Sequence, residues 1–363
     1  MNHINSTDMK KLFILALAAA GVASVSAQEC KQLYEQGKKL EDVFNKEKPS
    51  MTKPNNQITA DGAAALLQAN EIYQQVVECE KAPNAKGKVE DKLTKKIHKS
   101  LKEHAEAGDY NKAAIVLFNA DKKYPEAYNA FMLSGTETSK LGTVADTVYA
   151  VDFYNAGNTA YSAGQFAEAA KAYAAARKAN AIEPEAYVYN IDALRRVAMA
   201  DTTYDASDDI FAIAGEGIER FGAGNEYLYN NYIQHYIDKE DYDNAIKMLD
   251  KQIAAEPGNA NLYRLRAIVN FYKKEFKASI PDFLKVGELG TNFGYVRDAA
   301  NTVNKIGKAY LANATSAQKE EILGIFDSAL KIANQAKALE GADGSVDEII
   351  DDINYNIDNA NKL

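Results

Sequence analysis

The sequence is poor in the residues that most often build metal and thiol sites. Among 363 residues it has no tryptophan, two cysteines and four histidines. His98 and His104 are separated by about 240° around a helix, so they cannot hold one metal ion from the same face. We expect both on the solvated surface, and we expect His235 in a contact between helices. No metal site is predicted.

Positive charge is also in short supply. The 42 lysines and arginines are outnumbered by 51 aspartates and glutamates, which gives a formal net charge of −9. A surface of that sign repels the phosphate backbone, so we predict no nucleic-acid partner. The sequence lacks a Gly-x-Ser-x-Gly motif, a phosphate-binding Gly-x-x-x-x-Gly-Lys loop and a calcium loop in the EF-hand register. We therefore predict no cofactor and no enzymatic activity; an enzyme that assembles its carboxylates from distant segments is the less favoured alternative.

Long apolar runs are absent after the first part of the chain. Lys10 and Lys11 precede the apolar residues 12–23, and a short segment ending at Ala27 follows them. A basic start, a short apolar centre and small residues before the cleavage point are typical of a secretory signal peptide, and this run is too short for a hydrocarbon layer of ~30 Å. We predict a signal peptide over residues 1–27 with translation from Met9, and a mature periplasmic or secreted chain without a transmembrane span. A retained membrane anchor is the alternative.

The two cysteines flank a predicted helical hairpin. Residues 31–45 and 63–80 carry apolar side chains at helical spacing, and the stretch between them contains two prolines and reads as a loop. If the two helices pack antiparallel, Cys30 lies beside Cys79, and an oxidising compartment permits a bond between them. We predict a Cys30–Cys79 disulfide; two unpaired thiols are the alternative.

Part of the sequence repeats with a period of about 34 residues. Aromatic, small and apolar positions recur across two consecutive segments in these pairs: Tyr229 and Tyr263, Tyr242 and Phe276, Ala245 and Ser279, Leu249 and Phe283. A helical hairpin cannot bury its apolar stripe alone, so each unit needs small residues where helices touch and bulky residues that reach the next unit. The period therefore predicts stacked helical hairpins.

These repeats resemble the tetratricopeptide repeat (TPR) family. In the best unit, residues 150–183, the matching residues are Phe153, Gly157, Gly164, Phe166, Ala169, Tyr173 and Ala176. Three further units resemble the family, over residues 94–127, 226–259 and 260–293. The resemblance implies an all-α, right-handed solenoid of TPR-like helical hairpins with irregular inserted loops and a C-terminal capping helix.

The predicted domain organisation follows from these units. An N-terminal helical hairpin over 28–93 precedes the TPR array over 94–293, and a helical pair with a cap occupies 294–363. We expect an inserted loop over 134–148. Ser345 and Glu348 have the spacing of a capping box, which predicts a last helix that runs to about Ala360.

The resemblance also implies a concave groove, which in the family is lined by the first helices of successive repeats. The positions carried over to this chain are Tyr154, Asn158, Tyr161, Tyr227, Asn230, Gln234, Arg264, Ile268, Phe271 and Tyr272. Tyrosines give stiff contact area and amides can pair with an extended backbone, so this surface suits a peptide or protein segment. A basic clamp for a terminal carboxylate is not expected, because only Arg264 is basic at the required position. Packing between hairpins is the alternative role for these aromatic residues.

We therefore predict an exported TPR-like scaffold that mediates protein-protein interaction in the bacterial cell envelope. The predicted partner is another envelope protein or a peptide segment. A receptor for carbohydrate or a small ligand, using the same aromatic surface, is the alternative.

Overall fold

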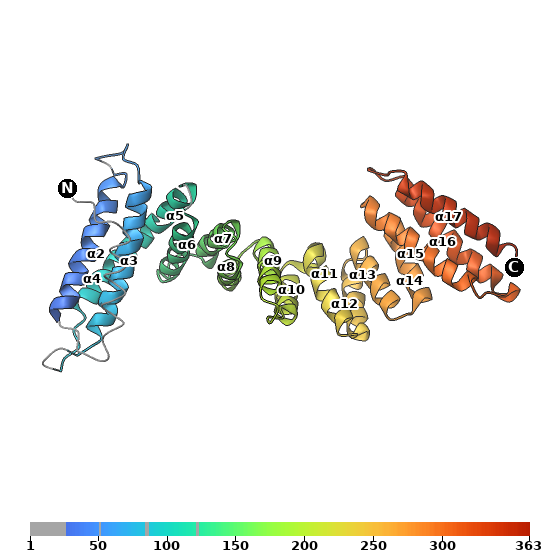
Figure 1. Ribbon diagram of the computed structural model, residues 1–363, viewed down its shortest axis with the longest axis horizontal. Helices are drawn as coiled ribbons and strands as arrows, with labels where there is room; N and C mark the ends of the chain where they lie inside the picture. Colours follow the sequence, from blue (N-terminus) through green and yellow to red (C-terminus); the bar gives the residue numbers. More distant parts are fainter. Residues whose placement is uncertain (1–26, 51, 84–86, 121–122) are drawn as a thin grey trace. The chain divides into compact units, whose positions relative to one another are not determined.

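The computed structural model describes residues 27–50, 52–83, 87–120 and 123–363 (Figure 1). Within these ranges the chain forms sixteen α-helices, labelled α2 to α17, with two short 3-10 helices and no β-strand. The predicted signal peptide lies outside the described residues, except for Ala27, which begins α2. None of the helices in these ranges is both long enough and apolar enough to cross a membrane.

The helices follow one another through short connections. The first eight are α2 (Ala27–Glu47), α3 (Ala60–Glu80), α4 (Lys92–Glu106), α5 (Asp109–Asn119), α6 (Tyr124–Ser139), α7 (Asp146–Ser162), α8 (Phe166–Lys178) and α9 (Glu185–Ala200). The others are α10 (Ser207–Phe221), α11 (Glu226–Asp238), α12 (Tyr242–Ala255), α13 (Ala260–Tyr272), α14 (Phe276–Leu289), α15 (Phe293–Leu311), α16 (Lys319–Lys337) and α17 (Ser345–Ala360).

The chain divides into two compact units, residues 1–193 and 194–363, with the division inside α9. In each unit, consecutive helices pack against each other, such as α6 with α7 and α7 with α8 in the first, and α15 with α16 and α16 with α17 in the second (Figure 1). Each unit is therefore an all-α stack of helical hairpins, as the sequence predicted.

The division differs from the domain boundaries expected after residues 93 and 293. In the first unit, Phe44 of α2, Ile97 of α4 and Phe131 of α6 belong to one apolar core. In the second, Phe283 of α14 and Phe326 of α16 share another core with the last helix. The N-terminal hairpin and the C-terminal helices thus lack separate cores, because each buries its apolar face against the neighbouring repeats.

The four predicted repeat units share one turn geometry. The fifteenth residue of each unit has positive φ: Gly108 (66°), Gly164 (72°), Glu240 (55°) and Lys274 (66°). This left-handed conformation reverses the chain between the two helices of the hairpin, and only glycine adopts it without steric cost. The same conformation at the same position in all four units indicates that they share one register.

Cys30 and Cys79 are joined by a disulfide between the start of α2 and the end of α3, with Cα atoms 5.7 Å apart. The two helices pack antiparallel along their length (Figure 1). The bond therefore closes the open end of this hairpin.

Two local expectations are wrong. The loop expected over 134–148 is shorter, because α6 continues to Ser139 and α7 begins at Asp146. Ser134 is buried and donates to Asp152 over 2.7 Å, so this polar stretch packs as helix. The capping box at Ser345 is absent: the Asp343 carboxylate accepts from the Ser345 backbone N–H over 2.9 Å, and no side chain caps α17.

Candidate functional site

The predicted groove residues of the first unit lie on α7 and connect it to α8 and α9. The Tyr154 ring packs against Tyr173 and Tyr189, with centroids 5.8 Å and 6.3 Å away. The Asn158 side-chain oxygen accepts a hydrogen bond of 2.8 Å from the Tyr173 hydroxyl. The Tyr161 hydroxyl donates a hydrogen bond to the Asp192 carboxylate on α9. These side chains therefore hold neighbouring helices together as well as forming a surface.

Gly157 allows Tyr173 to approach α7. A Cβ atom at residue 157 would lie 2.4 Å from Cε1 of the Tyr173 ring, which is too close for any other side chain. Tyr173 is almost fully buried in this position, and its ring stacks on Tyr189 at 5.9 Å. Gly157 thus sets the position of Tyr173, which in turn supports the rings of Tyr154 and Tyr189.

A shallow open pocket lies beside Tyr154, between the start of α7 and the connection to α9. Its volume is about 300 Å³, and its lining is formed by Thr147, Ala150, Val151 and Tyr154 together with Ala181, Ile182, Glu183, Glu185 and Ala186. We call this the α7–α9 pocket. The amide of Asn180 donates to Asp146 over 3.1 Å, which ties the α8–α9 connection to the first residue of α7.

The rim of the α7–α9 pocket is unusually apolar for a solvated surface. Val151 and Ile182, which line the pocket, are 50% and 59% exposed, and Tyr189, whose ring packs against Tyr154, is 41% exposed. Single exposed apolar residues are ordinary, but adjacent ones around a concavity mark interaction sites. The arrangement can bind an apolar group by excluding water from these side chains.

The charged groups of this pocket are acidic. Among the described lining residues, Glu183 and Glu185 carry the only formal charges, and neither forms an ion pair within the described chain. Burial raises the pKa of Tyr154, and the neighbouring Tyr189 and Glu185 raise it further. The hydroxyl therefore stays protonated, and the pocket presents negative charge from its glutamates.

In the second unit, α11 and α13 carry the other predicted groove residues. Tyr227 accepts a hydrogen bond of 2.9 Å from Arg195, and Asn230 accepts one of 2.9 Å from Arg264. Gln234 is exposed and donates to Asp238 on its own helix over 2.7 Å. The structure thus brings Asn230 and Arg264 together, whereas the Gln234 side chain bonds along its own helix.

Arg264 is occupied by contacts within the second unit. Its guanidinium donates to Asn261 over 2.8 Å and lies 4.4 Å from the centroid of the Tyr295 ring. Burial lowers the pKa of Arg264, although nearby acidic groups oppose that shift. This arginine therefore joins helices of the second unit.

The remaining predicted residues have different surroundings. Ile268 is half-buried and packs against the apolar core around Tyr229. Phe271 packs edge-on against Phe276 at 5.0 Å, and Tyr272 is largely exposed.

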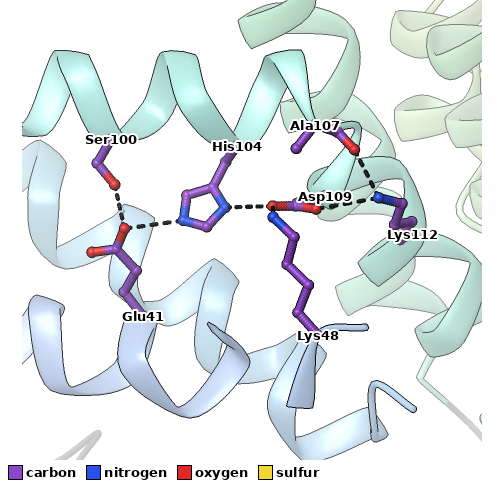
Figure 2. Close-up of polar contacts among 7 residues, drawn as sticks. All are labelled: Glu41, Lys48, Ser100, His104, Ala107, Asp109 and Lys112. Carbon is purple, nitrogen blue, oxygen red and sulfur yellow. Dashed lines mark hydrogen bonds and ion pairs between the residues drawn. The ribbon is translucent and has the colours of Figure 1, made fainter. Parts of the chain in front are cut away.

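A buried polar cluster links α2, α4 and α5 in the first unit (Figure 2). His104 is only 6% exposed, which corrects the expectation of a solvated side chain, while His98 is exposed as expected. The His104 ring lies between two carboxylates, with Nδ1 2.9 Å from Asp109 and Nε2 3.0 Å from Glu41. Lys48 pairs with Asp109, and Ser100 donates to Glu41.

This cluster has the residue types of a catalytic site without the required geometry. Both ring nitrogens of His104 face carboxylates, so neither is free to accept a proton from a nucleophile. The Ser100 hydroxyl donates to Glu41 and not to His104. The carboxylates stand on opposite sides of the ring, and no group of His, Cys, Asp and Glu in the described ranges converges as a metal ligand set. We interpret the cluster as a structural contact between helices.

His235 is in a helix contact as expected. Its ring stacks on Phe211 of α10 with centroids 4.1 Å apart. Nε2 lies 3.9 Å from an Asp208 oxygen, which is a weak ion pair at most.

The sequence-based groove prediction named Tyr154 but omitted several pocket residues. Val151 occupies the second position of its repeat, one of the positions that line the groove in the TPR family. The repeat pattern could therefore have identified it. Ile182, Glu183 and Glu185 lie in the connection between repeats and at the start of α9. No repeat position identifies them, because the connection varies from one unit to the next.

The helices and their pairing define a protein built from stacked α-helical hairpins. No protein-family model matches this sequence, and no curated protein matches it either. Among solved structures, YrrB, described as a TPR protein with an unusual peptide-binding site, is 12% identical over 55% of this chain and 96% of its own, with a TM-score of 0.36.

Two other solved structures are similar to the same extent. The C-terminal part of a TPR repeat-containing protein from Cytophaga hutchinsonii is 15% identical over 70% of this chain and 99% of its own, with a TM-score of 0.36. Yeast Tom70 is 16% identical over 98% of this chain and 78% of its own, with a TM-score of 0.35. At these values the likeness adds nothing to the site, whose description rests on the helices and contacts of this chain.

Proposed function

We propose that this chain is an exported, non-enzymatic scaffold that binds a segment of another envelope protein in the α7–α9 pocket. The observation that carries the proposal is exposed apolar surface at a concavity beside α7: Val151 and Ile182 line the pocket, and Tyr189 packs against Tyr154 of its wall. The signal-type sequence before Gln28 supports export, and so does the disulfide between Cys30 and Cys79.

The rigid support of the pocket also favours binding. Tyr154 and Tyr189 are held by the buried Tyr173, so an incoming segment meets rings that are already ordered. Ordered aromatic side chains lose little conformational entropy when a partner covers them.

The test is photo-crosslinking in living cells from a photoreactive residue placed at position 151. Position 115 is the matched control, because Ile115 is 47% exposed and lies on α5 of the same unit. We expect a specific protein, identified by mass spectrometry, from position 151 and not from position 115. Identical products from both positions would contradict the proposal, and recovery of glycans or small ligands alone would favour a receptor instead.

A further inference from the structure

The α7–α9 pocket has a chemical character that limits what can occupy it. We propose that its occupant is a protein segment with a branched aliphatic side chain that enters the pocket and with lysine or arginine next to it in sequence. This inference rests on the function proposed above and adds the chemistry of the partner.

The branched aliphatic side chain of the proposed segment is inferred from the apolar lining of the α7–α9 pocket. Ala150, Val151, Ala181 and Ile182 surround the opening, and Tyr154 forms one wall. An apolar side chain that enters displaces water from these groups and gains about 25 cal/mol for each Å² of apolar surface buried. The volume of about 300 Å³ suits one side chain and its backbone better than an extended ligand.

The lysine or arginine of the proposed segment is inferred from the unpaired negative charge of the pocket. Glu183 and Glu185 line the pocket, no lysine or arginine lines it, and neither glutamate has an ion-pair partner among the described residues. Glu185 begins α9, where the helix dipole favours a negative charge, but Glu183 precedes the helix and has no such role.

Asp146, at the start of α7, adds to the negative charge on this face. It accepts hydrogen bonds from the Tyr149 hydroxyl and the Asn180 amide, which are both neutral donors. Among the described residues, no lysine or arginine pairs with these carboxylates, and a cationic side chain from a partner would compensate them.

The sign of this charge separates the possible occupants. Anionic lipid headgroups and nucleic acid would be repelled by these carboxylates. A peptide that offers its own terminal carboxylate would also be disfavoured, so the recognised segment lies within a chain or carries its charge on basic side chains. The charge and the apolar lining together favour a basic, aliphatic protein segment.

The test is selection of short random peptides from a displayed library on the mature chain, which begins at Gln28. We expect enrichment of peptides with Val, Leu or Ile flanked by Lys or Arg. The affinity of a selected peptide should fall by about tenfold when its basic residues become Glu, and by a similar factor when its aliphatic residue becomes Ser. Raised salt should weaken the wild-type complex.

Variants of the pocket glutamates separate the preference for basic residues from the preference for an aliphatic residue. In the Glu183→Gln, Glu185→Gln double variant, the preference for basic over acidic peptides should disappear while the preference for the aliphatic residue remains. The control is Glu126→Gln with Glu340→Gln, which removes two exposed glutamates outside the pocket lining and should bind like wild type.

The outcomes also distinguish this inference from the function on which it depends. Enrichment of acidic or uncharged peptides, or equal binding by the wild-type chain and the Glu183→Gln, Glu185→Gln variant, would overturn the proposed chemistry. If crosslinking at position 151 still captured a specific protein, the scaffold function would stand with a different partner chemistry. Failure of both peptide enrichment and crosslinking would overturn both.

Discussion

At the residue scale, glycines that face aromatic rings recur along the chain. Gly157 faces Tyr173, Gly135 faces Phe153 and Gly307 faces Phe326, and a Cβ atom at any of these glycines would lie within 2.7 Å of the ring. In each case the glycine and the ring belong to neighbouring helices, so the absence of a side chain lets the two helices approach closely. The sequence identified Gly157 through its repeat position, whereas Gly307 lies outside the recognised units.

Gly157→Ala tests this close approach. We expect it to lower the free energy of unfolding by about 1–3 kcal/mol, because the added methyl group overpacks the contact with Tyr173. Gly324→Ala is the matched control: this glycine lies within α16 with open space around it, so alanine should stabilise by up to about 1 kcal/mol through helix propensity. Urea unfolding measures both, and equal effects of the two substitutions would refute the packing argument.

The environment of His104 could not be read from its position in the sequence. The helix-face argument considered only residues of the same helix, whereas the partners of His104 come from other helices. Glu41 lies 63 residues earlier on α2, and Asp109 begins α5. Only the packing of α2 against α4 brings these groups together, and a single sequence contains no signal for that contact.

The protonation states of this cluster follow from its contacts. Burial alone would lower the pKa of His104, but hydrogen bonds and charges from Asp109 and Glu41 outweigh it and raise the pKa above 6.5. For Glu41, burial alone would raise the pKa, but hydrogen bonds from His104, Ser100 and Tyr73 outweigh it and lower the pKa to about 2. The pKa of Asp109 is also lowered, because hydrogen bonds and positive charge from His104 and Lys48 outweigh the effect of burial. These contacts therefore favour the imidazolium form of His104 between two carboxylates in the folded state.

These shifts predict how stability depends on pH. The pKa of His104 is higher in the folded state than in the unfolded state. Its contribution to the free energy of unfolding is therefore complete below about pH 6.5 and is lost as pH rises through the folded pKa. The lowered pKa of Glu41 adds stability above about pH 4.5, which is lost as pH falls toward 2. His104→Gln should cost about 3–5 kcal/mol near pH 6 and less at pH 9.

Urea unfolding of wild type and His104→Gln between pH 6 and 9 measures this dependence. His98→Gln is the control, because His98 is exposed and makes none of these contacts. If the wild type and His104→Gln lost stability in parallel over this range, the imidazolium would not be the cause.

At the element scale, the turn between the two helices of each repeat is the most regular feature. Glycine occupies the left-handed position in two units, and Glu240 and Lys274 occupy it in the other two. A residue with a Cβ atom in this conformation costs roughly 1–2 kcal/mol relative to glycine. The last two units therefore carry local strain that the first two lack.

Exchanging residues at this position tests the shared register. Lys274→Gly should raise the free energy of unfolding by about 0.5–1 kcal/mol, and Gly164→Ala should lower it by a similar amount. Thermal unfolding gives both values, with Lys273→Gly as the control, because Lys273 has negative φ (−65°) at the end of α13. Stabilisation by both lysine substitutions would show that the turn geometry is not responsible.

Helix positions were predicted better than helix ends. The repeat units predicted over 226–259 and 260–293 each contain one pair of helices, α11 with α12 and α13 with α14. The segment around Ser134 and Gly135 has the composition of a loop, yet Gly135 faces the Phe153 ring and Ser134 bonds to a buried carboxylate. Burial between neighbouring helices overrides local turn preferences, and this burial depends on contacts that a single sequence does not show.

At the scale of the whole molecule, the sequence predicted the repeat fold and one wall of the candidate site. Tyr154 was found because the repeat position specifies it. The two glutamates of the pocket lining were missed. Glu183 and Glu185 lie in or next to the α8–α9 connection, where Asn180 has a positive φ of 56° and bonds to Asp146. The candidate site therefore combines a repeated helix face with an irregular connection.

The intact mass of the protein isolated from its native compartment tests export and disulfide together. We expect a chain that begins at Gln28 and has the mass of one disulfide bond, with no free thiol until it is reduced. Reduction should lower the stability of the first unit by about 4 kcal/mol, since the bond closes a span of 49 residues. A mass that includes residues 1–27, or two free thiols in native material, would contradict the proposed export.

The central claim is that the α7–α9 pocket binds the partner. The most direct measurement is the dissociation constant of the protein crosslinked from position 151, determined by calorimetry for wild type, Val151→Asp and Ile115→Asp. Both substitutions place one carboxylate at a half-exposed apolar position of the first unit. The account predicts that Val151→Asp weakens binding by about tenfold or more while Ile115→Asp binds like wild type. Equal affinities for all three proteins would contradict it.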